Sequence, residues 1–171
     1  CKLISQHADS MGAPTACESA GVPNVSYNGS TLDACPNTFI VSSRINWVPY
    51  MKYMIECVRD NKAIDTDWCK GINEGAVELT PINEKVAAPG TAEAIKAAEE
   101  QFKAGTLHVF DTSTFTVDGK TLTSYIADVD TDEKFTPDTE VISNGYFHES
   151  EKRSAPYFDI NIDGITLLNE G

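Results

Sequence analysis

The sequence predicts an α/β fold with a mostly parallel central sheet, helices on both faces and a β-hairpin after the sheet. Three observations predict it. Short apolar runs alternate with helical segments as far as about residue 110. The run at residues 38–42 is β-branched and apolar, which is typical of a strand buried on both faces. Asp118-Gly119 then lies between two β-prone runs, which is a strong signal for a type I′ hairpin.

The predicted strands follow from apolar or β-branched runs that are bounded by turn-forming residues. The run at 22–27, for example, ends in Asn28-Gly29-Ser30, and the runs at 114–117 and 121–126 flank the hairpin turn. Residues 128–140 are acidic and contain Pro137, so they are predicted to form a surface loop. The predicted strands are residues 3–6, 22–27, 38–42, 107–110, 114–117, 121–126 and 157–168, the last of which is expected to close the sheet.

Three helices are predicted from apolar periodicity and end signals. Residues 13–20 follow a cap at Asp9-Ser10 and stop at Gly21. A second helix carries Trp47, Tyr50, Met51, Met54 and Val58 at helical spacing, with Asn46 as its cap and Pro49 in its first turn. The third runs over residues 91–104, with Gly105 as its stop and four side chains expected to face inward: Ala94, Ile95, Ala98 and Phe102.

Composition narrows the class of protein. A chain of 171 residues predicts a single domain over residues 1–171. Its formal charge of −13 argues against nucleic acid or an anionic membrane surface as the main partner. No apolar run is long enough for a transmembrane helix, and the first residues do not form a signal peptide. The five cysteines contain no CxxC pair; Cys17 and Cys57 fall on apolar helix positions and are expected in the core.

Polar and aromatic side chains gather where predicted strands end, which is where open α/β sheets bind ligands. Four segments meet this description: residues 6–9, 27–28, 44–47 and 71–75. Amides, a carboxylate and aromatic rings suit a small polar ligand with a flat ring. Structural roles remain alternatives, since Asp9 and Asn46 would serve as helix caps and Trp47 as a core residue. The candidate ligand-binding residues are Gln6, His7, Asp9, Tyr27, Asn28, Asn46, Trp47 and Asn73.

The sequence offers no enzymatic motif, and we expect no catalytic residue, metal ligand or cofactor. It contains no GxSxG, P-loop or GxGxxG sequence. Residues 128–132 begin like a calcium loop, but Glu133 stands where the loop needs glycine and Thr139 where it needs a bidentate glutamate. The three histidines lie far apart in the sequence and are not spaced as metal ligands: His7, His108 and His148.

Taken together, these segments resemble the second lobe of the basic-membrane-protein (PnrA-like) family of bacterial solute-binding lipoproteins. Residues 4–10, ISQHADS, resemble the family's "AQHTDS", and residues 25–28, VSYN, are similar to "IGYN". The most distinctive match is SSRINWVPY at 42–50, which resembles "SPVWNWGPYY". WCKGINEGAVELTP at 68–81 looks like "WWGGIKDGVVDLAP". Residues 92–111 follow the family's next helix and strand, after which the resemblance fades.

The resemblance implies a Rossmann-like lobe of a type I periplasmic-binding-protein fold. In that family two lobes close on a nucleoside, with a purine nucleoside the expected ligand here, and deliver it to the permease of an ABC transporter. Such proteins are extracytoplasmic and are held at the membrane only through a lipid anchor. On this interpretation the chain begins inside a longer protein and lacks the amino-terminal lobe. Asn73 occupies the family's lysine position, which puts the contacts to the ribose in doubt.

Two other functions stay open at this stage. An extracytoplasmic sensor or cell-surface module of the same fold, without transport, would account for the Asn73 departure and for the hairpin. A nucleoside hydrolase-like enzyme would need a carboxylate cluster with calcium-binding geometry, which the sequence does not display.

Overall fold

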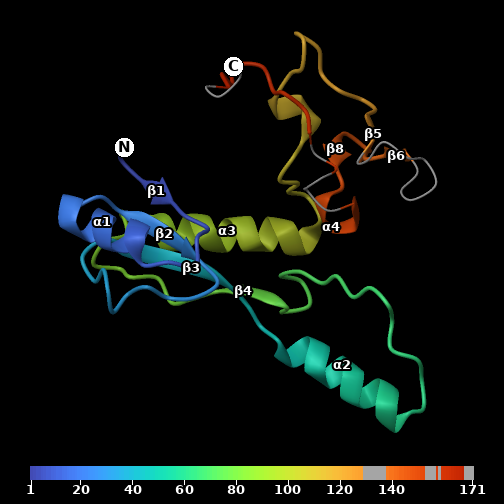
Figure 1. The fold of residues 1–171 in the computed structure, drawn as a ribbon, viewed down its shortest axis with the longest axis horizontal. Coiled ribbons are helices and arrows are strands. Elements are labelled where there is room, and N and C mark those ends of the chain that lie inside the picture. The colour runs from blue at the N-terminus through green and yellow to red at the C-terminus, as the bar shows by residue number, and fades with distance from the viewer. Residues whose placement is uncertain (129–137, 153–156, 158, 168–171) are drawn as a thin grey trace. The chain divides into compact units, whose positions relative to one another are not determined.

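The computed structural model describes residues 1–128, 138–152, 157 and 159–167 (Figure 1). By its internal contacts the chain divides into two compact units, Cys1–Thr106 and Leu107–Gly171. Among the described residues, no helix is both long and apolar enough to cross a membrane. The single domain expected from chain length stays a prediction, and the unfolding experiment in the Discussion tests it.

A four-stranded sheet organises the first unit. Its strands are β1 (Ile4–Ser5), β2 (Asn24–Tyr27), β3 (Phe39–Ile45) and β4 (Val77–Leu79), hydrogen-bonded in that order. β1, β2 and β3 run parallel, whereas β4 runs antiparallel to β3. This mostly parallel sheet with helices confirms the predicted α/β class. The first three strands fall inside or overlap the predicted ones, because their β-branched and apolar residues suit a pleated, partly buried surface.

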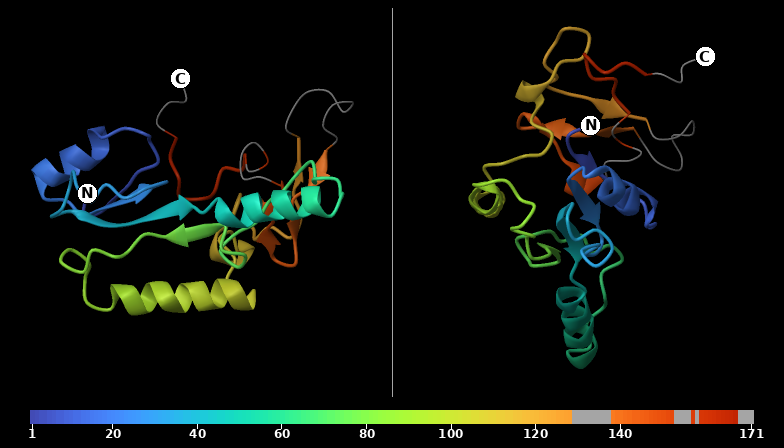
Figure 2. Two further views of the ribbon diagram at one scale, coloured as in Figure 1. Left: turned by 90° about the horizontal axis from the view of Figure 1, so that it is seen from below. Right: turned by 90° about the vertical axis from the view of Figure 1, so that its left-hand side faces the viewer.

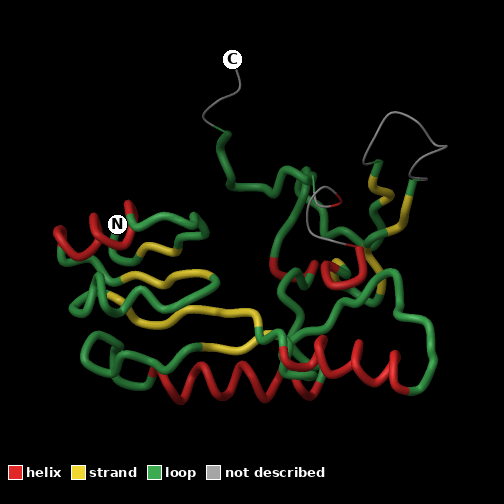
Figure 3. The backbone as a smooth tube through the Cα atoms, turned by 60° about the horizontal axis from the view of Figure 1, so that its bottom comes forward, coloured by secondary structure: helices red, strands yellow, loops and turns green. Residues whose placement is uncertain are grey.

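Three helices accompany the sheet: α1 (Gly12–Ala20), α2 (Val48–Arg59) and α3 (Thr91–Ala104). In Figures 2 and 3 the strands of the sheet lie between α1 and α3. α3 begins and ends where the sequence predicts, because Gly105 takes a left-handed conformation (φ 68°) and donates its N–H to the Phe102 carbonyl. The predicted cap of α1 is wrong. Met11 holds the N-cap position with no side-chain hydrogen bond, and Asp9 lies outside the helix.

The helices bury fewer of their apolar side chains than the helical spacing of these residues suggests. The prediction that Ala94 faces inward is wrong, since it is exposed, while Ile95, Ala98 and Phe102 are only half-buried. On α2 only Cys57 is buried, as predicted, and Cys17 is likewise buried on α1. The remaining apolar side chains of α2 include a row at spacings of three and four residues that is open to solvent: Val48, Met51, Ile55 and Val58.

The second unit is built from short elements around a small core. Its strands pair as two separate hairpins, β5 (Ile126–Ala127) with β6 (Thr139–Glu140), and β7 (Ile142–Ser143) with β8 (Tyr146–Phe147). A short 3-10 helix, η1 (Thr112–Thr114), precedes them, and α4 (Glu149–Lys152) follows. The core consists of the fully buried side chains Ala127, Val141, Ile142 and Phe147.

Several sequence predictions for the second unit need correction. Residues 107–110 form no strand; Phe110 packs edge-on against Phe147 instead, with ring centroids 5.8 Å apart. Between 157 and 168, the described residues contain no strand either. The hairpin turn is confirmed, because Asp118 and Gly119 both have positive φ and Val117 and Lys120 exchange both backbone hydrogen bonds. Its arms, however, form only this bridge. Most of the predicted acidic loop, residues 129–137, lies outside the described residues.

Candidate ligand-binding rim

Four segments of the first unit meet along one edge of the sheet. Three of them lie at the carboxyl ends of β1, β2 and β3, namely residues 6–9, 27–29 and 44–47. Because β4 is antiparallel, its preceding loop, residues 71–76, lies at the same edge. The Asn46 N–H donates to the Ala76 carbonyl at 2.8 Å, which ties these last two segments together. We call these four segments the rim.

The register of the strands divides the rim into two steps. Tyr27 at the end of β2 is paired with Ser43, whereas β3 continues to Ile45, which is paired with Val77. Asn46 therefore lies three residues beyond the level of Tyr27, a distance of about 10 Å along a strand. The side chains of the two steps therefore project from different levels of the sheet edge.

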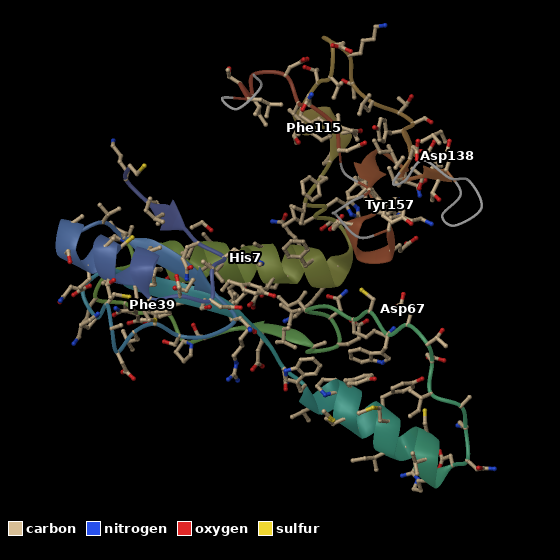
Figure 4. All side chains as sticks on the ribbon, in the orientation of Figure 1. His7, Phe39, Asp67, Phe115, Asp138 and Tyr157 are labelled. Atoms are coloured by element: carbon tan, nitrogen blue, oxygen red, sulfur yellow. The ribbon has the colours of Figure 1, made fainter. Side chains whose placement is uncertain are left out.

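The lower step carries a pair of stacked rings. His7, in the loop after β1 (Figure 4), lies against Tyr27 with ring centroids 4.2 Å apart and planes 16° from parallel. Both residues are exposed, so the outer faces of the pair remain available for a flat group. The backbone N–H of Gln6 donates to the Val25 carbonyl at 3.2 Å, which fixes the start of this loop beside β2.

The Gln6 side chain has an unsatisfied acceptor. Its Oε1 atom is buried and has no hydrogen-bond partner among the described residues. A buried acceptor without a donor costs free energy, on the order of 1–3 kcal/mol. Gln6 is therefore the rim residue that most requires a hydrogen-bond donor from outside the protein.

Two of the predicted residues, Asn28 and Asn46, have structural roles. Asn46 donates from Nδ2 to the Gly75 carbonyl (3.0 Å) and accepts from the Val48 N–H at Oδ1 (3.1 Å), so its side chain holds the start of α2 against the loop before β4. Trp47 occupies the N-cap position itself. Asn28 has a left-handed backbone (φ 63°), as a turn after β2 requires.

The remaining predicted residues face solvent. Trp47 is 59% exposed, so the alternative that it is a core residue is wrong. Asp9 and Asn73 are also exposed, and Asn73 lies in the turn before β4, where the Gly71 N–H donates to the Glu74 carboxylate at 3.1 Å. All eight predicted residues thus lie in the rim segments. Gln6, His7 and Tyr27 are brought together on the lower step, and Asn46, Trp47 and Asn73 come from the upper one.

Sequence reasoning missed an aromatic cluster beside the upper step. Trp68 lies against Tyr50 and Tyr53 of α2, with ring centroids 5.1 Å and 6.2 Å away. The Tyr53 hydroxyl accepts the Asp65 N–H at 2.9 Å. That backbone bond lowers the pKa of Tyr53, but the Asp65 carboxylate and burial outweigh it and raise the pKa to about 12. The signal was present, because Tyr50 and Tyr53 are three residues apart on one helix face.

Among the described residues, no group of three or more His, Cys, Asp or Glu side chains is arranged to hold a metal ion. The rim offers a stacking surface at His7 and Tyr27 and hydrogen-bonding groups such as the Gln6 side chain.

The fold is similar to part of a solved bacterial protein. Residues covering 63% of this chain resemble an ABC transporter solute-binding protein from Conexibacter woesei DSM 14684, with 18% sequence identity and a TM-score of 0.49. The matched part spans 37% of the length of that protein. No protein-family model matches the sequence, and no curated protein matches it.

Proposed function

We propose that this chain is one ligand-binding lobe of a solute-binding protein that serves an ABC importer and captures a nucleoside or a similar small molecule with a flat ring. The observation that carries the proposal is the lower step of the rim, where the rings of His7 and Tyr27 are stacked and exposed and the preceding residue, Gln6, has an Oε1 without a hydrogen-bond partner. A flat ring would extend the stack, and a ligand N–H or O–H would satisfy Gln6.

The upper step would supply the second contact. Trp47 is held at the start of α2 by the hydrogen bonds of Asn46, yet its ring is open to solvent. An exposed aromatic ring at a fixed backbone position is well suited to cover a flat ligand, because it presents a large apolar face at the edge of the sheet. Within this proposal, the protein is extracytoplasmic and lipid-anchored, belongs to the basic-membrane-protein type, and is partnered by a second lobe and a permease.

The proposal is tested by tryptophan fluorescence. The chain has two tryptophans, so Trp68→Phe leaves Trp47 as the sole reporter. Titration with purine nucleosides, free bases and ribose up to millimolar concentrations should give saturable quenching with the ring compounds and none with ribose. One lobe supplies part of the contacts, so a dissociation constant near the millimolar range is expected for this chain.

Two variants sharpen the test. Tyr27→Ala should weaken the ligand response at least tenfold, because it removes half of the stacked pair. Ile55→Ala, an exposed apolar change on α2 away from the rim, should leave it unaltered. If no ring compound changes the fluorescence or the melting temperature of the chain, ligand binding at the rim is wrong.

A further inference from the structure

Three side chains of the second unit are arranged in series as nucleophile, base and carboxylate. The Ser143 hydroxyl lies 2.7 Å from Nε2 of His148, and Nδ1 of the same ring lies 3.3 Å from Oε1 of Glu151. Ser143 is the last residue of β7, His148 follows β8, and Glu151 lies in α4. The three come from neighbouring positions in the chain, which a hairpin folds back on itself.

The hairpin fixes this geometry. Asn144 and Gly145 both have positive φ (54° and 84°), so a tight turn brings the segment after Tyr146 back beside Ser143, with which Tyr146 is paired. The His148 backbone N–H donates to the Val141 carbonyl at 3.1 Å, which anchors the residue to the buried core of the unit.

Stacking contacts also fix the orientation of the His148 imidazole ring. Tyr146 stacks against it with centroids 4.1 Å apart, and His108 stacks on Tyr146 at 3.6 Å. The His148 side chain is only 13% exposed, whereas Ser143 is exposed. The base is therefore positioned before any substrate arrives, and the hydroxyl that it faces is open to solvent.

The acceptor groups around His148 bear on where the imidazole proton lies. A carboxylate only accepts, so Glu151 favours the tautomer with the proton on Nδ1 and leaves the Nε2 lone pair directed at Ser143. Nε2 also lies 3.2 Å from the Ser143 carbonyl oxygen. A carbonyl oxygen only accepts, so this contact suits the point of the reaction at which Nε2 has taken up the Ser143 proton.

We propose that Ser143 is an activated nucleophile, with His148 as its general base and Glu151 as the group that orients the base, and that it accepts acyl groups from small activated esters. Such a triad is defined by geometry and roles, and it recurs on unrelated folds. Ser143 is exposed, so its substrates approach from solvent. We therefore expect small, reactive esters as the substrate class. This activity is separate from solute binding at the rim.

The chemical step balances without any cofactor. Ser143 Oγ forms a bond to the ester carbonyl carbon while its proton moves to His148 Nε2. The bond from that carbon to the leaving oxygen then breaks, and the leaving oxygen takes the proton from Nε2. Water repeats the sequence on the acyl-serine and releases the carboxylic acid, which regenerates the Ser143 hydroxyl.

The test uses the full chain with p-nitrophenyl acetate. Release of p-nitrophenol gives the acylation rate, and mass spectrometry of proteolytic peptides gives the acetylated residue. Acetyl on Ser143 is expected, and Ser143→Ala should abolish it. His148→Gln should lower the rate of Ser143 acetylation about a hundredfold or more, the usual contribution of a general base. Glu151→Gln should give a smaller loss.

A matched control separates the triad from ordinary hydroxyl reactivity. Ser30 is also exposed, but its hydroxyl accepts the Leu32 N–H at 3.2 Å, so Ser30→Ala should change nothing. Circular dichroism spectra establish that each variant is folded. The proposal is overturned if acetyl appears on lysines, cysteines or the amino terminus but not on Ser143, or if His148→Gln acetylates Ser143 at the wild-type rate.

Discussion

Phe147 offers a test of whether the two compact units unfold separately. Its side chain is 0% exposed, lies in the core with Val141 and Ile142, and meets the ring of Phe110 edge-on. Truncation by Phe147→Ala removes a buried aromatic ring and leaves a cavity, at a cost of about 3–5 kcal/mol.

The second unit has little stability to lose. At roughly 0.05–0.15 kcal/mol per residue, a unit spanning residues 107–171 holds about 3–10 kcal/mol. With a urea dependence of about 1 kcal/mol per molar, the substitution should lower its unfolding midpoint by about 3–5 M or unfold it outright. The first unit should keep its midpoint, because Phe147 belongs to the core of the second.

The two units can be followed separately. Both tryptophans, Trp47 and Trp68, lie in the first unit, so tryptophan fluorescence in urea reports on it alone. Hydrogen exchange of the Val141 and Phe147 amides reports on the second. Phe39→Ala, which truncates a buried ring in the first unit, is the reciprocal control. The two urea midpoints to compare are the one from tryptophan fluorescence and the one from hydrogen exchange. If Phe147→Ala lowers both by the same amount, the chain unfolds as one cooperative domain and the reasoning from two units is refuted.

Two smaller predictions follow from individual hydrogen bonds. Asn46→Ala removes the bonds to Gly75 and Val48 and should lower the unfolding free energy by about 1–2 kcal/mol in urea titration, whereas no change would mean that these bonds do not hold the loop. The Ser124 hydroxyl and nearby backbone N–H groups lower the pKa of Glu140 below 4.5, so this carboxylate stabilises the second unit above about pH 4.5 and loses that effect as the pH falls through its lowered pKa. In wild-type protein, hydrogen exchange should show the amides of the second unit losing protection as the pH falls below about 4.5. Glu140→Gln should reduce this loss, and an unchanged loss would contradict the assignment.

The elements that the sequence predicted well are those whose local signals agree with one another. α3 combines a helical period with a glycine stop, and both of its ends were located correctly. β2 and β3 combine β-branched residues with burial. In such segments local preference and tertiary packing favour the same structure, so a pattern in the sequence is sufficient.

Prediction failed where an apolar run was the only signal for a strand. Residues 107–110 are apolar enough for one, but Phe110 instead packs edge-on against Phe147 in an irregular segment. An apolar run indicates neither how far its side chains are buried, since Val109 is 57% exposed, nor which backbone partner, if any, would pair with the strand. The same ambiguity accounts for the strand expected after residue 157.

For the rim, the sequence predicted the location but not the contacts. The rule that ligands bind beyond the carboxyl ends of strands accounts for three of the segments. The fourth, residues 71–75, joins them for another reason, because it precedes the antiparallel strand β4, which was not predicted from the sequence. The rule does not reveal that His7 stacks on Tyr27 or that Asn46 is engaged by Gly75 and Val48, since these depend on register. His148 was likewise judged alone, because only the Asn144-Gly145 turn brings Ser143 to it.

The reversed direction of β4 determines where the chain tolerates insertions. The loops after β1 and β2 leave the sheet edge, so an added residue there can bulge into solvent. The loop at 71–76 instead leads into β4, whose register is set by the pairing of Val77 with Ile45. One extra residue next to Val77 would turn every β4 side chain to the opposite face of the sheet and exchange the environments of Glu78 and Leu79. Length changes in this part of the protein should therefore accumulate in the exposed stretch at 61–67 and be rare immediately before β4.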